Sequence, residues 1–124
     1  MVKYKYMGMT DVRITIKNPR NPQKKYQGEF LVDSGATYTV VPENILKKIG
    51  VKPQREETFI LADGTPIKRN VGSVLYEYQD REAAAPVLFG KKDDSKLLGI
   101  FTLEALGLTL DPLKRTLHKA LLRL

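Results

Sequence analysis

The sequence predicts a single, mostly β domain over residues 1–124. Short runs of alternating apolar and polar residues are separated by turn signals, which is typical of strands joined by loops. No internal repeat, low-complexity tract or linker divides the chain. A domain of this size buries roughly two-thirds of the surface that its unfolded chain exposes, so it can fold without covalent cross-links.

The first half of the chain predicts three strands followed by a short helix. Alternating or β-branched apolar residues indicate the strands, which are expected at residues 11–17, 26–32 and 37–41. The helix is expected at residues 42–50, because Pro42 can begin a helix and Gly50 can end one in the left-handed conformation. Ile45 and Ile49 are four residues apart and share one face of this helix.

A long hairpin is expected next. Asp63-Gly64 between two strand-like runs is a strong hairpin signal, and the arms are expected at residues 57–61 and 66–78. Pro66 has no N–H for a sheet hydrogen bond, so the start of the return arm is expected at an edge.

The last third predicts short strands around one helix. A strand is expected at residues 85–89, an apolar run follows at 96–100, and Thr102 can cap a helix that ends at Gly107. Two more strands are expected on either side of Asp111-Pro112. The final residues, 118–124, fit a strand or a helix.

The composition excludes several kinds of site. Cysteine is absent, so disulfides and thiolate metal sites are excluded, and the single histidine, His118, does not supply a zinc site. No acidic cluster has convincing spacing for a carboxylate metal site. No Gly-rich phosphate-binding loop is present, and no serine lies in a nucleophile elbow. We therefore expect no cofactor and no metal.

The net charge of +7 is concentrated at the two ends of the chain, around a slightly acidic middle. Basic ends attract polyanions, so a small nucleic-acid-binding β-barrel is one alternative function. The basic residues are not interleaved with aromatic residues that would stack on bases, so nucleic acid is not the expected partner. No signal peptide is visible, and no apolar run approaches the roughly 20 residues of a membrane span. We expect a cytoplasmic protein.

The segment EFLVDSGATYTVVP, residues 29–42, places an acid directly after an apolar strand. Taken alone, Asp33-Ser34-Gly35 is most simply a turn with an Asx-type cap. A carboxylate can also act as a general base, but amide cleavage needs an acid as well, to protonate the carbonyl oxygen or the leaving nitrogen. Two carboxylates that share one proton supply both groups. A two-fold dimer would bring a second Asp33 to its axis.

Three elements in this order resemble the retropepsin-like, or retroviral-type, aspartyl protease family. Asp33-Ser34-Gly35-Ala36 resembles the D-[ST]-G-[AS] signature, and Leu97-Leu98-Gly99 resembles the second signature, two apolar residues and a Gly before a short helix. The hairpin turn at residues 62–65 falls between them, where this family carries its flap. The resemblance implies a retropepsin-like acid-protease closed barrel with one or two short helices and a flap hairpin, of the single-domain cellular type.

The resemblance also implies a role for each residue of the first signature. Asp33 would activate a water molecule together with Asp33 of a partner chain. Ser34 would take part in the hydrogen bonds that link the two catalytic loops. Gly35 would permit close approach of the backbone to the substrate, and Ala36 would keep the loop compact.

Two other groups of residues would shape the substrate cleft. Leu97 and Leu98 would form its floor, with Gly99 allowing tight packing below the catalytic loop. The tip of the flap, which closes over an extended peptide, would be formed by Ala62, Asp63, Gly64 and Thr65.

The sequence departs from the viral pattern at several positions. Many viral members brace the dimer with an Asp–Arg pair, whereas this chain has Thr37 and Ile100 there. Asp63 would add negative charge near the cleft, which would favour basic substrate side chains or raise the pKa of the dyad. Viral dimers interleave terminal strands, but basic termini would repel one another in that arrangement. We therefore expect a different interface.

The sequence thus predicts an aspartic endopeptidase, a hydrolase that acts as a homodimer on extended peptides or unfolded proteins. Activity should be highest at acidic to mildly acidic pH, because the dyad must hold one proton. The main alternative is a catalytically silent peptide-binding or scaffold module of the same fold.

Overall fold

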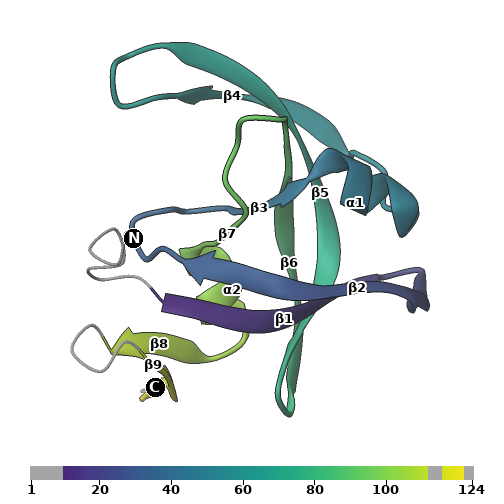
Figure 1. Cartoon of the computed structure of the whole chain (residues 1–124), viewed down its shortest axis with the longest axis vertical. Coiled ribbons are helices and arrows are strands. Elements are labelled where there is room, and N and C mark those ends of the chain that lie inside the picture. The colour runs from purple at the N-terminus through teal and green to yellow at the C-terminus, as the bar shows by residue number, and fades with distance from the viewer. Residues whose placement is uncertain (1–9, 112–115, 122–124) are drawn as a thin grey trace.

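The computed structural model describes residues 10–111 and 116–121, which form nine strands and two short helices (Figure 1). In chain order the elements are β1 (Thr10–Asn18), β2 (Asn21–Val32), β3 (Thr39–Pro42), α1 (Glu43–Lys48), β4 (Arg55–Ile60), β5 (Pro66–Tyr78), β6 (Arg81–Gly90), β7 (Leu97–Leu98), α2 (Ile100–Ala105), β8 (Leu108–Asp111) and β9 (Thr116–Lys119). The predicted mostly β class is confirmed.

Seven strands form one sheet in the order β1-β2-β7-β3-β6-β5-β4, and β1 also pairs with β5. This extra pairing joins the six strands from β1 to β5 into a ring, while β4 continues outward along β5. Alternate residues point into the ring, so that Ile14 and Ile16 are fully buried, as the alternation in this segment predicts. Facing residues complete the core, among them Phe30, Val32, Val41, Val74, Tyr76, Val87, Leu98 and Leu103.

The short strand β7 lies between β2 and β3, although it follows them by more than fifty residues. It runs parallel to β2, with Leu98 beside Val32, and antiparallel to β3, with Leu97 beside Val40. The loop that joins β2 to β3 therefore passes over the end of β7 and the start of α2. This arrangement brings Asp33 next to residues near position 100.

Most predicted elements are present, with shifted ends. Helix α1 follows Pro42, and Gly50 has a φ of 78°, as its predicted stop requires. The predicted cap of the second helix is wrong, because Gly99 occupies the cap position of α2 and Thr102 is buried inside the helix. Strand β6 begins at Arg81, before the predicted start at residue 85. The alanines at its start have low β propensity and gave no strand signal.

The C-terminal segment forms a separate two-stranded sheet, in which β8 pairs with β9 from Leu108–Lys119 to Asp111–Thr116. The two predicted strands are confirmed, while most of the connection at residues 112–115 lies outside the described residues. His118 and Lys119 belong to β9, so the helical alternative does not hold there, and residues 122–124 lie outside the description. In the described part of the chain, no helix has the length and apolar character to cross a membrane.

Candidate active site

Asp33 is the first residue after β2, and the loop that follows fixes its carboxylate. Its backbone N–H donates to the Leu98 carbonyl at 3.0 Å, and its own carbonyl accepts from Ala36 N–H at 3.0 Å. The backbone N–H of Gly35 donates to Asp33 Oδ1 at 2.9 Å. The segment is therefore the Asx-type turn that the sequence suggests, and the turn also orients the carboxylate.

The first amides of α2 hold the next part of this loop. Ile100 N–H donates to the Ala36 carbonyl at 2.8 Å, and Phe101 N–H donates to the Thr37 carbonyl at 3.1 Å. The first N–H groups of any helix lack partners within the helix, so they are available for this purpose. Thr37 and Ile100 occupy the positions of the viral ionic brace, and here backbone hydrogen bonds join the same two segments.

Gly99 permits the close approach of these segments. A Cβ atom at this position would lie 2.6 Å from both the C and O atoms of Tyr38 and 2.8 Å from the Thr37 carbonyl oxygen. These are backbone atoms, which cannot move aside as a side chain can. Any side chain at position 99 would therefore clash with the backbone of this loop.

A buried hydroxyl pair that sequence reasoning missed lies below the loop. Thr39 Oγ1 and Thr102 Oγ1 are 2.5 Å apart, and Gly99 N–H donates to Thr39 Oγ1 at 3.0 Å. Both threonines are fully buried. Burial raises the pKa of the neighbouring Tyr76 hydroxyl, which donates to the Pro86 carbonyl at 2.8 Å. A Thr at each of two positions 63 residues apart gives no sequence signal of this kind.

A cavity of about 600 Å³ lies beside Asp33. Its lining comes from the loop after Asp33, from the inner strands, from the β4–β5 hairpin and from the β6–β7 loop: Leu31, Asp33, Ala36, Thr37, Tyr38, Val40, Phe59, Ile67, Arg69, Leu88, Asp93, Asp94, Ser95 and Leu97. Its size falls within the usual range of ligand sites. It brings together the predicted residues Asp33, Ala36 and Leu97.

The other predicted site residues lie outside this lining. Leu98 is fully buried and packs in the core, directly behind Leu97, which is half-buried. Ser34 and Gly35 are exposed on the outer side of the loop. The hairpin tip, which comprises Ala62, Asp63, Gly64 and Thr65, is exposed as well.

The β4–β5 hairpin forms the uppermost part of the molecule in Figure 1 and ends in a tight turn. Leu61 N–H donates to the Thr65 carbonyl at 2.8 Å, and Gly64 adopts a φ of 89°, which favours glycine. Thr65 N–H donates to Asp63 Oδ1 at 2.9 Å, and hydrogen bonding from Thr65 lowers the pKa of Asp63. The Asp63 carboxylate therefore stabilises the hairpin turn and does not line the cavity.

An aromatic cluster connects the catalytic loop to this hairpin. Tyr38 packs edge-on against Phe59 of β4, with ring centroids 5.5 Å apart, and against Phe101 of α2 at 5.4 Å. Edge-to-face pairs of this kind contribute roughly 0.5–1.5 kcal/mol beyond their buried area. Phe59 and Tyr38 also line the cavity, so the hairpin and the loop after Asp33 form adjoining parts of its wall.

A family model described as Aspartyl protease matches residues 12–75, which is more than half of the chain and includes both Asp33 and the hairpin. The chain belongs to the aspartyl protease family. The later Leu97-Leu98-Gly99 segment lies beyond the matched residues, and the structure brings it against the matched part. No curated protein matches the chain significantly.

Two solved structures are similar to this family member. The solution structure of Simian Foamy Virus (mac) protease superimposes with a TM-score of 0.54 and 24% identity, covering 77% of this chain and 92% of that chain. The crystal structure of a retropepsin-like aspartic protease from Rickettsia conorii gives a TM-score of 0.49 and 22% identity, covering 88% of each chain. The predicted retropepsin-like fold is thus confirmed by the first of these.

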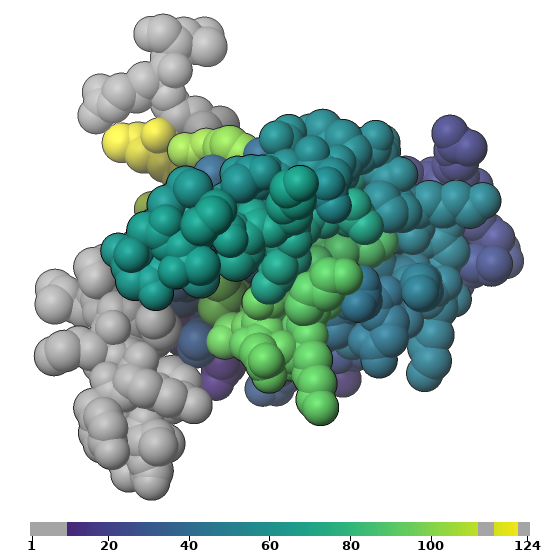
Figure 2. All heavy atoms as spheres, turned by 90° about the horizontal axis from the view of Figure 1, so that it is seen from above, coloured from purple at the N-terminus to yellow at the C-terminus, as the bar shows by residue number. Residues whose placement is uncertain are grey.

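An ion pair joins the hairpin of this aspartyl protease family member to the β6–β7 loop. Arg69 Nε and Nη2 donate to the two carboxylate oxygens of Asp94, at 2.7 and 3.0 Å. Both side chains are largely buried, with exposed fractions of 16% and 22%. Figure 2 shows the hairpin, in teal, beside the loop, in green, on one face of the molecule. The pair therefore fixes two walls of the cavity relative to each other.

Replacing Asp94 is expected to destabilise the fold in a pH-dependent manner. Hydrogen bonding from Arg69 lowers the pKa of Asp94, so the pair's contribution is complete above the unfolded-state pKa and is lost as the pH falls through the folded-state pKa. We expect Asp94→Asn to lower the free energy of unfolding by about 1 kcal/mol at neutral pH, a deficit that shrinks below about pH 4. Urea denaturation of the wild type and the variant, at neutral pH and below about pH 4, measures this difference in unfolding free energy.

The neighbouring Asp93 provides the control for this substitution. It is exposed and has no hydrogen bond or ion pair with any residue that the structure describes. Asp93→Asn should therefore change the unfolding free energy by less than about 0.5 kcal/mol. A deficit for Asp94→Asn that is the same at all pH values would contradict the role assigned to the ion pair.

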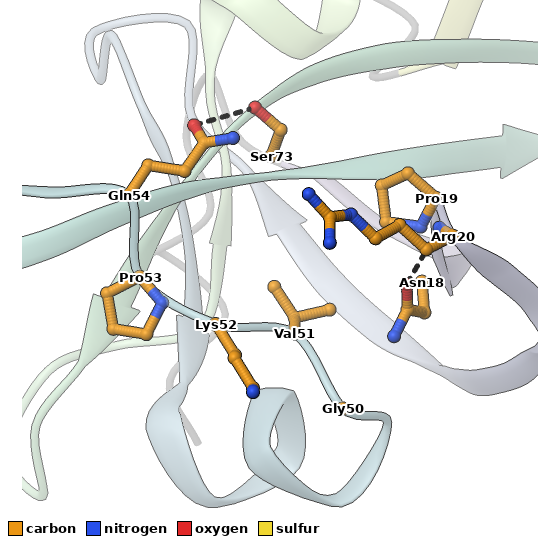
Figure 3. A pocket seen from close by; sticks show the side chains of 9 residues that line it. All are labelled: Asn18, Pro19, Arg20, Gly50, Val51, Lys52, Pro53, Gln54 and Ser73. Carbon is orange, nitrogen blue, oxygen red and sulfur yellow. Dashed lines mark hydrogen bonds between the residues drawn. The ribbon is translucent and has the colours of Figure 1, made fainter.

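A second cavity, of about 510 Å³, lies near α1 and contains no catalytic acid (Figure 3). Its lining includes Arg20 and Lys52 but no carboxylate, and Ser73 donates a hydrogen bond to Gln54 at 3.2 Å across one wall. Within residues 10–111 and 116–121, no three His, Asp or Glu side chains are grouped closely enough to hold a metal ion. The cavity beside Asp33 is therefore the candidate active site.

Proposed function

We propose that the protein is an aspartic endopeptidase whose active unit is a homodimer, with one Asp33 from each chain. The observation that supports this most directly is the placement of Asp33 at the end of a buried strand, on the wall of a cavity that a hairpin covers. Each chain supplies a single such acid, and amide hydrolysis needs a base and an acid at once. A two-fold axis beside the catalytic loop supplies the second carboxylate.

The chemistry follows from two carboxyl groups that share one proton. The ionised Asp33 takes a proton from a water molecule whose oxygen attacks the peptide carbonyl carbon, while the protonated Asp33 gives its proton to the carbonyl oxygen. The Asp33 that took the proton from water then gives it to the amide nitrogen, and the other Asp33 takes a hydroxyl proton from the tetrahedral intermediate as the C=O bond re-forms and the C–N bond breaks. The dyad is then singly protonated again. Gly35 N–H bound to Asp33 Oδ1 keeps each carboxylate in a fixed orientation through these steps.

Several other residues have proposed roles around the dyad. The exposed Ser34 would contact the partner's catalytic loop, and Gly35 and Ala36 would keep the loop backbone close to the substrate. An extended peptide would lie between the catalytic loop and the hairpin and pair with it as an added strand. The hairpin tip, Ala62 to Thr65, would then close over the peptide as a flap.

Cleavage of a mixed peptide library by the wild-type protein and by Asp33→Asn tests this proposal. We expect the wild type to cleave, with a maximum between about pH 4 and about pH 6, where the dyad holds one proton. Asp33→Asn is expected to lower the rate by at least about a thousandfold, because the neutral amide cannot accept a proton from water. The variant should fold normally.

Two results would contradict the proposal. Equal rates for the two proteins would show that Asp33 does not carry the reaction. Tight binding of peptides without cleavage by the wild type at any pH would instead identify a peptide-binding module of the same fold.

A further inference from the structure

The cavity beside Asp33 carries more negative than positive charge. Three carboxylates line it, from Asp33, Asp93 and Asp94, whereas Arg69 supplies the single positive side chain of the lining. A charged side chain of the lining can bind a ligand most readily if it has no ion-pair partner within the protein. The hydrogen bonds of the described residues show which of these four side chains are paired.

Arg69 donates three hydrogen bonds within the protein. Its Nε and Nη2 atoms donate to Asp94 at 2.7 and 3.0 Å, and its Nη1 atom donates to the Lys68 carbonyl at 2.8 Å. The Arg69–Asp94 pair is therefore neutral as a unit, so Arg69 adds no net positive charge to the lining of the cavity. Apart from Asp33 itself, the charge that remains is that of Asp93.

Asp93 is exposed, lines the cavity and lies in a hydrogen-bonded turn. Asp94 N–H donates to the Lys91 carbonyl at 3.0 Å, and Lys91 N–H donates back to Asp94 Oδ2 at 2.7 Å. Asp93 lies within this turn, and among the described residues it has no hydrogen-bond or ion-pair partner. An unpaired carboxylate on a hydrogen-bonded turn can bind a cation without breaking an interaction within the protein.

The nearby lysines do not neutralise Asp93 inside the cavity. Lys91 Nζ pairs with Glu43 at 3.4 Å, and Lys96 Nζ donates to the Tyr26 hydroxyl at 2.9 Å. Neither of these lysines lines the cavity, and neither does Lys92.

The rest of the cavity wall is mainly apolar. Its aliphatic and aromatic members are Leu31, Val40, Tyr38, Phe59, Ile67, Leu88 and Leu97. Lysine and arginine have a long apolar stem and a charged end. The stem could pack on this apolar wall while the charged end pairs with Asp93. A neutral apolar side chain would leave Asp93 without a partner.

We propose that this cavity is a subsite for a lysine or arginine side chain of the substrate next to the scissile bond, and that Asp93 is its specificity-determining residue. The proposal rests on the proposed peptidase function, because it identifies the substrate class of the same cleft. It assigns to Asp93 the preference for basic side chains that the sequence suggests for Asp63, whose carboxylate is bound in the hairpin turn.

Peptide binding to the inactive Asp33→Asn protein tests the subsite independently of cleavage. Two fluorescent peptide series, identical except for lysine or its uncharged analogue norleucine at each position in turn, are compared by anisotropy. At one position the lysine peptide should bind about fivefold more tightly, the value of one partly exposed ion pair. Adding Asp93→Asn should remove this difference, and Asp93→Lys should reverse it in favour of norleucine, because like charges repel.

The matched control is Asp80→Asn, an equal change of charge in the exposed β5–β6 turn. It should leave the preference for lysine unchanged. Equal affinity for both peptides at every position, a preference that survives Asp93→Asn, or no peptide binding would each overturn the subsite. Cleavage of the same peptides by the wild type reports on the proposed function separately. Binding that follows Asp93 without any cleavage would retain the subsite and reject the peptidase.

Discussion

Adding about a tenfold excess of Asp33→Asn chains to a fixed amount of wild-type protein is expected to lower peptide cleavage about tenfold, if chains pair at random in a two-fold dimer. Each active site then needs Asp33 from both chains, and nearly every wild-type chain is paired with a variant chain. The effect should be largest at concentrations above the dimer dissociation constant. Initial cleavage rates across a titration with the variant measure it.

The matched control in this experiment is the addition of Asp80→Asn chains in place of Asp33→Asn chains. They carry the same change of charge at an exposed turn and keep Asp33, so adding them should increase the rate. A rate that does not change with excess Asp33→Asn chains would show that a single chain suffices, which would rule out the shared dyad. Inhibition by both variants would indicate competition unrelated to Asp33.

Gly99→Ala is expected to lower the free energy of unfolding by about 3 kcal/mol or more, as overpacking against immobile backbone does. The added Cβ would lie 2.6 Å from backbone atoms of Tyr38, so either the catalytic loop or α2 must move. Movement breaks the hydrogen bonds from Ile100 and Phe101 to the loop and misplaces Asp33. We expect cleavage to be lost together with stability, and urea denaturation measures the stability change.

Gly64→Ala separates this steric effect from a general intolerance of side chains at glycine positions. Gly64 has a φ of 89° but nothing within 4 Å of an added Cβ, whereas Gly99 has an ordinary φ of −99° and severe contacts. The cost of Gly64→Ala should therefore be limited to backbone strain of about 1 kcal/mol. Equal costs for the two substitutions would contradict the packing role of Gly99.

The sequence predicted those features that local chemistry determines. Alternation located β1, the Asp63-Gly64 turn located the hairpin, and Gly50 ended α1 with the expected positive φ. The order of the two signatures and the hairpin also identified the family. These signals are short-range, or come from a fixed order of motifs along the chain, and both kinds are visible without coordinates.

The features that the sequence did not reveal depend on contacts between distant segments. Arg69 pairs with Asp94 across 25 residues, and Thr39 meets Thr102 across 63. The segment Gly90-Lys91-Lys92-Asp93-Asp94 has the composition of an ordinary solvated turn, and only its position beside the hairpin places Asp93 in the cavity. Thr102 looked like a helix cap because Ser and Thr are favoured there, but tertiary packing buried it instead.

The amides of α2 that bind the catalytic loop make these two segments one cooperative unit. The helix holds Ile100 and Phe101 where they can donate to the loop, and these two bonds help to hold the loop in its shape. Local unfolding of either segment is therefore local unfolding of both. Fraying of this six-residue helix would remove two of the hydrogen bonds that hold the loop after Asp33, so the order of the helix and the order of the loop are coupled.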